Sequence, residues 1–168
     1  MTASLPSSLL PPFAAPLQMG RALATTGHAV VSPDGLAELT GTPLADFDAL
    51  RPTWDDLPPD AYLRDGGRYR RRRHACFVVD GEALAPVPHR AHWQPVEYNA
   101  LHGGLERWFE PMAPDVLGRP AWQRLLVRLA AACSALKGAR PWYVEAHQFR
   151  IDTTDGIGRP TPEGAHRD

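Results

Sequence analysis

The sequence predicts an α+β fold, with helices flanking a barrel or sandwich of strands. Residues 142–151 are rich in aromatic and β-branched residues and alternate in character, which is typical of a strand. Residues 120–136, just before that strand, repeat apolar side chains at intervals of three, four and seven, the pattern of a helix lying on a sheet. We therefore expect a single domain over residues 1–168, with residues 1–12 as a loose arm.

The amino-terminal part predicts short helices and one short strand. A helix is expected from Phe13 to about Thr25, before a glycine that suits a helix end. Residues 28–31 suggest a strand. Ser-Pro and Thr-Pro pairs then predict helices over residues 33–39 and 43–50, because a capping residue followed by proline favours a helix start. These elements carry no obvious chemistry and should serve as packing for a sheet.

The helix over residues 120–136 has an apolar stripe that includes Cys133, so we expect this cysteine in the core and not at a reactive site. Pro120 suits the first turn and Gly138 the carboxyl-terminal cap. The helix should deliver the chain directly into the strand that begins at Trp142.

Composition excludes several classes of protein. The net charge of −1 gives no general attraction to nucleic acid or to anionic membranes. The two cysteines form no CxxC pair, which favours a reduced setting. No long apolar run could span a membrane, and the amino terminus lacks the basic region of a secretory signal. We expect a cytoplasmic protein without a membrane partner.

An arginine run at residues 68–73 invites a nucleic-acid interpretation, since clustered guanidinium groups beside an aromatic residue can bind phosphates and stack on bases. However, the run enters a hydrophobic strand at residues 75–79, so alternate arginines should face opposite sides of the sheet. We therefore favour a structural role or a place in a substrate-facing wall, and we expect no nucleic-acid partner.

A His-x-Asp pair at His166 and Asp168 could bind one metal ion, because strand side chains two residues apart share a face. An imidazole and a carboxylate are two of the three ligands in the triad that holds non-haem Fe(II). The third ligand cannot be found in the sequence. Taken alone, the tripeptide would more simply be a solvated loop.

Several separated segments, in the same order, resemble the iron- and 2-oxoglutarate-dependent dioxygenases of the L-isoleucine hydroxylase type, which include the biofilm, stress and motility protein A homologues. The segments are YLRDGGRYRRRRHACF, HWQPVEYNALHGGLERWFEPM, HQFRI and RPTPEGAHRD. The resemblance implies a double-stranded β-helix of the jelly-roll or cupin-like kind with flanking helices. It also implies Fe(II) as cofactor, 2-oxoglutarate as co-substrate, and His166 and Asp168 as the first two iron ligands.

Other site residues follow from the resemblance and the strand pattern together. On the strand over residues 142–151, Gln148 and Arg150 share one face, which we expect to look into the barrel. Arg150 could bind a carboxylate of the substrate or of 2-oxoglutarate, with Gln148 hydrogen-bonding beside it. An equal alternative pairs Arg150 with Glu145 or Asp152 at the strand edge. Tyr98 and Asn99 are candidates for the pocket lining, and no catalytic residue is identified.

The resemblance implies hydroxylation of a free aliphatic L-amino acid or a similar small molecule, with dioxygen consumed. The family continues to a distal histidine and a basic residue, whereas this chain ends at Asp168, so we expect a truncated β-helix. Its open strand edges make a homo-oligomer conceivable. The alternatives are a catalytically inactive interaction protein linked to stress or biofilm formation and, as an outsider, an arginine-rich nucleic-acid binder.

Overall fold

A computed structural model describes residues 12–63, 68–97, 103–154 and 156 of the chain. The chain divides into two compact units, each made of three segments. The first unit comprises Met1–Ala49, Val79–Leu84 and Gly118–Trp142. The second unit comprises Leu50–Val78, Ala85–Leu117 and Tyr143–Asp168. The expected loose arm lies almost wholly outside the described residues.

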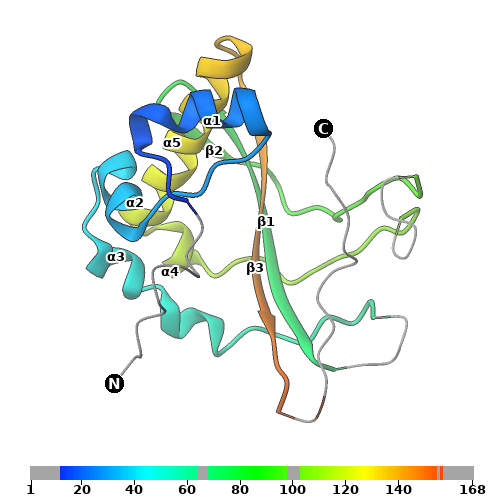
Figure 1. Ribbon diagram of the computed structural model, residues 1–168. Coiled ribbons are helices and arrows are strands. Elements are labelled where there is room, and N and C mark those ends of the chain that lie inside the picture. The colour runs from blue at the N-terminus through cyan, green and yellow to red at the C-terminus, as the bar shows by residue number, and fades with distance from the viewer. Residues whose placement is uncertain (1–11, 64–67, 98–102, 155, 157–168) are drawn as a thin grey trace. The chain divides into compact units, whose positions relative to one another are not determined.

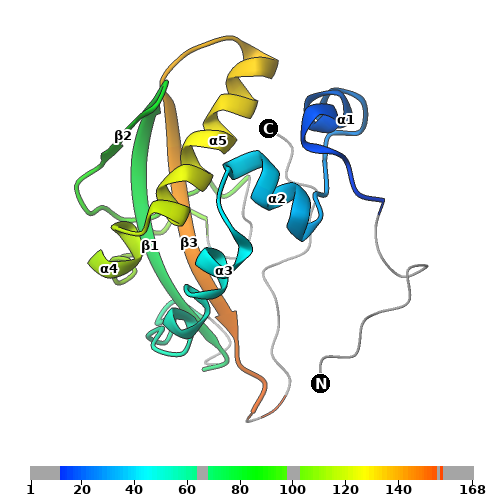
Figure 2. The same cartoon turned by 90° about the vertical axis from the view of Figure 1, so that its left-hand side faces the viewer.

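The first unit is built from helices around a long one, α5. Its elements are η2 (Pro16–Gln18), α1 (Met19–Thr26), α2 (Pro33–Thr40), α3 (Leu44–Asp48) and α5 (Pro120–Lys137). Helix α5 contacts α1, α2 and α3, and Figure 2 shows α2 lying beside it. The Ser32 hydroxyl accepts a hydrogen bond of 3.0 Å from the backbone N–H of Gly35 and caps α2, as the Ser-Pro pair predicted.

Helix α5 begins at Pro120 and is capped by Gly138, as predicted. Gly138 has a φ of 86°, which only glycine adopts at little cost. The expectation that Cys133 lies in the core was wrong, because Cys133 is exposed. The buried side of α5 is centred on its first three turns, with Trp122 and Leu126 among its members. The last turns of the helix have fewer packing partners in the described part of the chain.

The strands form one sheet in the order β2-β1-β3. They are β1 (Arg70–Asp80), β2 (Ala83–Pro86) and β3 (Trp142–Ile151), and β1 and β3 run side by side in Figure 1. Asp152 follows the last residue of β3, and Tyr69 precedes the first residue of β1. The Asp152 N–H donates to the Tyr69 carbonyl at 2.6 Å, so the end of β3 lies beside the start of β1 and these strands are antiparallel. Strand β3 has the predicted bounds.

The second unit also contains η3 (Arg51–Trp54) and α4 (Pro114–Leu117). Two isolated antiparallel bridges extend its pairing, Pro59 with Arg71 and His92 with Arg107, and His74 bridges Pro111 in parallel. These bridges matter for the site, because two of them join the segments at Pro59 and Pro111 to the central strand β1, and the third joins His92 to Arg107.

The α+β class is confirmed, but a double-stranded β-helix is not: in the described part of the chain the named strands form a three-stranded sheet. The strand expected over residues 28–31 was wrong. That segment has no regular secondary structure, and its backbone hydrogen bond from Ala14 N–H to the Val30 carbonyl is too little for a ladder. No helix of the described chain has the length and apolar character needed to cross a bilayer.

Candidate functional site

Strand β1 divides its arginine run between two faces. The even-numbered residues from 70 to 76 are buried, whereas residues 71, 73 and 75 are partly exposed. On the partly exposed face, Arg71 and Arg73 donate to the backbone carbonyls of Leu57 and Pro111, at 3.1 and 3.0 Å. The buried face is formed by Arg70, Arg72, His74 and Cys76. The run therefore does not form one continuous basic patch.

The same face of the sheet continues on β3 with Glu145, His147 and Phe149, since alternate strand residues share a face. The His147 ring stacks on His74, with ring centroids 4.7 Å apart and planes at 27°. The bridge between His92 and Arg107 brings a third imidazole, which lies edge-on to His147 at 4.8 Å. Strand alternation and one loop bridge thus gather three histidines.

We call His74, His92, Glu145 and His147 the histidine cluster. One potential ligand atom from each residue lies within 4.8 Å of those of the other three, so the cluster could hold a metal ion. The two oxygens of Glu145 lie 2.9 Å from His92 Nδ1 and 3.8 Å from His74 Nε2. His74 is fully buried, and its Nδ1 has no hydrogen-bond partner among the described residues.

The charges in the cluster are strongly shifted. The nearby imidazoles of His74 and then His92 hold the pKa of Glu145 well below its usual range, so the carboxylate is ionised. Burial lowers the pKa of His147 to about 3, and the nearby guanidinium of Arg72 is the second-largest cause of this shift. His147 is therefore a neutral imidazole. Its Nδ1 accepts a hydrogen bond of 2.7 Å from Arg72 Nη2, which places the ring proton on Nε2.

The donor chemistry fits iron in part. His74, His92 and Glu145 supply two imidazoles and a carboxylate, the ligand types of the non-haem iron triad. His147 fits poorly, because a metal-bound histidine ordinarily donates its second ring N–H to an acceptor, and here that nitrogen faces a guanidinium. The cluster can hold a metal only in the presence of a neighbouring buried cation.

Three arginines of this unit are buried around one acid. Asp60 Oδ2 lies 2.7 Å from Arg70 Nε and 3.7 Å from Arg72 Nη1, and the Asp60 side chain is fully buried. Arg72 also lies on the Phe109 ring, with its central carbon 3.9 Å from the centroid. Burial lowers the pKa of Arg72 to about 10 against the opposing effect of Asp60, and burial also lowers the pKa of Arg107.

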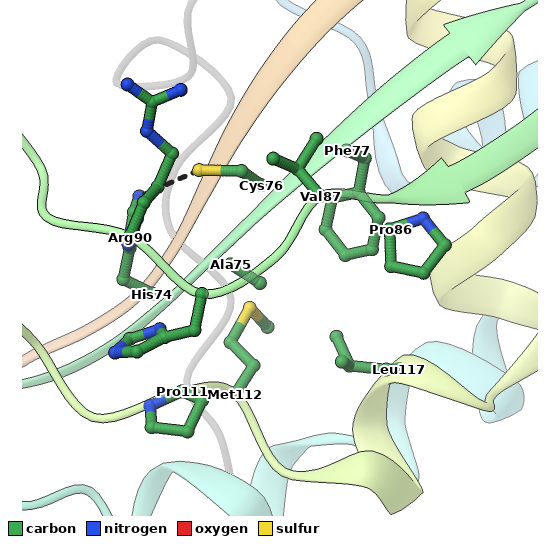
Figure 3. Close-up of a pocket in the computed structure, with 11 residues that line it drawn as sticks. His74, Ala75, Cys76, Phe77, Pro86, Val87, Arg90, Pro111, Met112 and Leu117 are labelled. Carbon is green, nitrogen blue, oxygen red and sulfur yellow. Dashed lines mark hydrogen bonds between the residues drawn. The ribbon is translucent and has the colours of Figure 1, made fainter.

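Two cavities adjoin the cluster. One, of about 200 Å³, is largely apolar and shares His74 and Cys76 with the cluster's face of β1. Figure 3 shows Met112 and Leu117 among its other lining residues. The Cys76 thiol lies 3.3 Å from His74 Nε2. The second is an open hollow of about 700 Å³ lined by Arg90, Ala91, Trp93, Tyr143 and Glu145. A small molecule entering this hollow reaches the cluster at Glu145.

The predicted binding pair lies on the other face of β3. Gln148 is buried and donates from Nε2 to Thr53 Oγ1 at 2.8 Å, while its Oε1 has no partner among the described residues. Arg150 pairs with Asp55 at 2.9 Å and approaches Asp152 at 4.0 Å. The alternative pairing of Arg150 with Asp152 is thus present, whereas Glu145 belongs to the histidine cluster on the opposite face. A binding role for Gln148 and Arg150 stays a prediction.

The other predicted site residues, His166, Asp168, Tyr98 and Asn99, lie outside the described residues. Sequence reasoning missed the histidine cluster itself. A local signal existed, because the alternation R-x-R-x-H-x-C in residues 70–76 and E-x-H in residues 145–147 each mark one strand face. These two strand faces coincide only because β1 and β3 pair across more than 70 residues of sequence. Local patterns do not predict that pairing.

The sequence and the fold resemble those of known proteins. A family model described as 2OG-Fe dioxygenase matches residues 51–168. Among solved structures, a bsmA homolog from Methylobium petroleophilum PM1 is 49% identical with a TM-score of 0.85; the match covers 94% of this chain and 64% of that one. A search of curated proteins found no match. This chain belongs to the 2OG-Fe dioxygenase family.

Proposed function

We propose that this chain carries the amino-terminal part of an Fe(II)- and 2-oxoglutarate-dependent hydroxylase that acts on a free aliphatic L-amino acid or a similar small molecule. The family match through Asp168 is the observation that carries the proposal, because it includes the His-x-Asp pair. A small, largely apolar cavity beside a polar cluster suits a substrate with an aliphatic side chain and a charged end.

In this proposal iron is held by His166 and Asp168, not by the histidine cluster. Arg72 donates directly into the cluster, and a second buried guanidinium, that of Arg107, interacts electrostatically with Glu145. Both positive charges would oppose a metal cation placed at the cluster. The cluster is better suited to line the chamber in which a bound molecule is oriented.

When bound, Fe(II) and 2-oxoglutarate supply oxidative chemistry: 2-oxoglutarate is decarboxylated to succinate, and one oxygen atom is inserted into a C–H bond of the substrate. The chain's own residues orient the substrate and exclude water. Glu145, ionised and open to the larger hollow, is placed to accept a hydrogen bond from an ammonium group. Gln148 and Arg150, predicted from the strand pattern, are one candidate pair for binding a carboxylate, and Arg150 could exchange its exposed partner Asp55 at little cost.

The activity can be tested by incubating the chain with Fe(II), 2-oxoglutarate, dioxygen and each aliphatic L-amino acid. Succinate and a product heavier by one oxygen atom are measured by mass spectrometry, with His166→Ala as the control. Succinate and hydroxylated product that both require His166 would support the proposal. Succinate without product would remove the amino-acid substrate class. Absence of succinate with every amino acid would contradict hydroxylase activity for this chain and would favour the interaction-protein alternative.

A further inference from the structure

Among the described residues, the buried face of the second unit holds more positive than negative charge. Arg70, Arg72 and Arg107 are only 2%, 7% and 3% exposed, and Asp60 is the acid that pairs with the first two. Glu145 is the other acid that interacts with this group, and it is already engaged by two histidines. In the described part of this unit, three guanidinium groups, which never deprotonate at neutral pH, thus face two carboxylates.

Each of these three guanidinium groups also keeps one buried nitrogen without a hydrogen-bond partner in the described part of the chain. These atoms are Arg70 Nη2, Arg72 Nε and Arg107 Nε. Buried side-chain donors are nearly always paired, and leaving a charged donor unpaired costs more than leaving a neutral one. Three orphaned donors in one charged group therefore indicate a missing acceptor.

Arg72 and Arg107 contact the same aromatic ring. Their central carbons lie 3.9 and 5.7 Å from the centroid of Phe109. The remaining contacts hold both side chains in place: Arg72 donates to His147, and Arg107 Nη2 donates to Gln94 Oε1 at 3.1 Å. The two groups are therefore held in position before any ligand arrives, as a binding site requires.

We propose that Arg72 and Arg107, supported by the Arg70–Asp60 pair, form the carboxylate-binding site of this protein. A carboxylate would neutralise the excess charge and accept from the orphaned Nε donors, and guanidinium groups match carboxylate geometry. The proposal rests on the proposed function and assigns the carboxylate to Arg72 and Arg107 in place of Arg150. The carboxylate belongs either to the amino acid or to 2-oxoglutarate, since both present the same chemistry.

Binding is measured without iron, so that the result does not depend on activity. The intact chain is titrated calorimetrically with acetate, isobutyrate, L-isoleucine and 2-oxoglutarate, with isobutyramide and L-isoleucinamide as neutral-end controls at matched ionic strength. We expect carboxylates to bind and their amides not to bind. Tighter binding of L-isoleucine than of 2-oxoglutarate would identify the amino acid as the source of the carboxylate, and the reverse order would identify 2-oxoglutarate. Heat of binding from none of the carboxylates would overturn the proposal.

Three variants locate the site. Arg72→Met and Arg107→Met remove one charge each, whereas Arg73→Met removes a charge from the same strand but from its opposite face. We expect the first two to raise the carboxylate dissociation constant by about tenfold or more, and Arg73→Met to leave it unchanged. Unchanged binding in Arg72→Met and Arg107→Met, with loss in Arg150→Met, would return the carboxylate to Arg150 and overturn the proposal.

A second readout covers variants that fold poorly. Because the group of buried arginines carries excess positive charge, Arg107→Met should leave the melting temperature of the ligand-free chain unchanged or raise it. A large fall in melting temperature together with intact carboxylate binding would mean that Arg107 is structural and would refute its assignment. The succinate assay reports separately on the proposed function. Carboxylate binding without succinate formation would support this binding site and contradict the hydroxylase activity. Succinate formation without Arg107-dependent carboxylate binding would support the hydroxylase activity and contradict this binding site.

Discussion

Replacing Asp60 with asparagine should remove a large part of the stability of the second unit. Asp60 Oδ2 lies 2.7 Å from Arg70 Nε, and the two side chains are 0% and 2% exposed. The other oxygen, Oδ1, accepts the backbone N–H of Tyr62 at 2.8 Å. Breaking a buried ion pair by removing one partner costs about 3–5 kcal/mol, because the remaining charge is left uncompensated. Solvent screening reduces this figure little, since both side chains are buried.

The loss is measured by urea unfolding followed by fluorescence, because the chain has five tryptophans. Asp55→Asn is the matched control, since Asp55 also pairs with an arginine at 2.9 Å but is 76% exposed, and it should cost less than about 1 kcal/mol. Replacing both partners, in Asp60→Leu with Arg70→Met, should recover much of the loss. An Asp60→Asn variant within about 1 kcal/mol of the parent would refute the view that this acid holds the buried arginines together.

Three further predictions concern single side chains. Iodoacetamide should modify Cys133 and spare Cys76 in the folded chain, since Cys133 is exposed and burial raises the pKa of the Cys76 thiol; equal rates by peptide mass mapping would contradict the packing. Ser32→Ala should lower the free energy of unfolding by about 1 kcal/mol through loss of the α2 cap, whereas Ser32→Asp should retain it. Hydrogen bonds from Thr154 lower the pKa of the Asp152 carboxyl below its ordinary 3.8, so its contribution to stability is present at neutral pH and is lost as the pH falls through the lowered value. Asp152→Asn should flatten that part of the acid unfolding curve, and an unchanged curve would argue against the contact.

The elements that depend on local pattern were predictable from the sequence. Strand β3 has the predicted bounds, and helix α5 ends at the predicted glycine. The exposure of Cys133 was not predictable, because an apolar stripe indicates which side of a helix can be buried but not where along the helix its partners stop. The amphipathic pattern of α5 extends beyond its buried turns.

The histidine cluster shows the limit of sequence reasoning for the site. His74 and His147 stack only because β1 and β3 pair in one register, and His92 joins them through a single bridge to Arg107. Each contact joins distant segments, so no local motif marks it. The His-x-Asp pair is a local motif, and the sequence therefore drew attention to His166 and Asp168 and not to the buried cluster.

The location of the iron is the central claim and can be measured directly. The chain is titrated anaerobically with Fe(II) in the presence of 2-oxoglutarate, and the visible charge-transfer band of the iron–2-oxoglutarate complex is followed in the parent, His166→Ala and His74→Ala. We predict a band that is lost in His166→Ala and retained in His74→Ala. A band retained in His166→Ala but lost in His74→Ala would place the iron in the histidine cluster and contradict the assignment of that face to substrate binding.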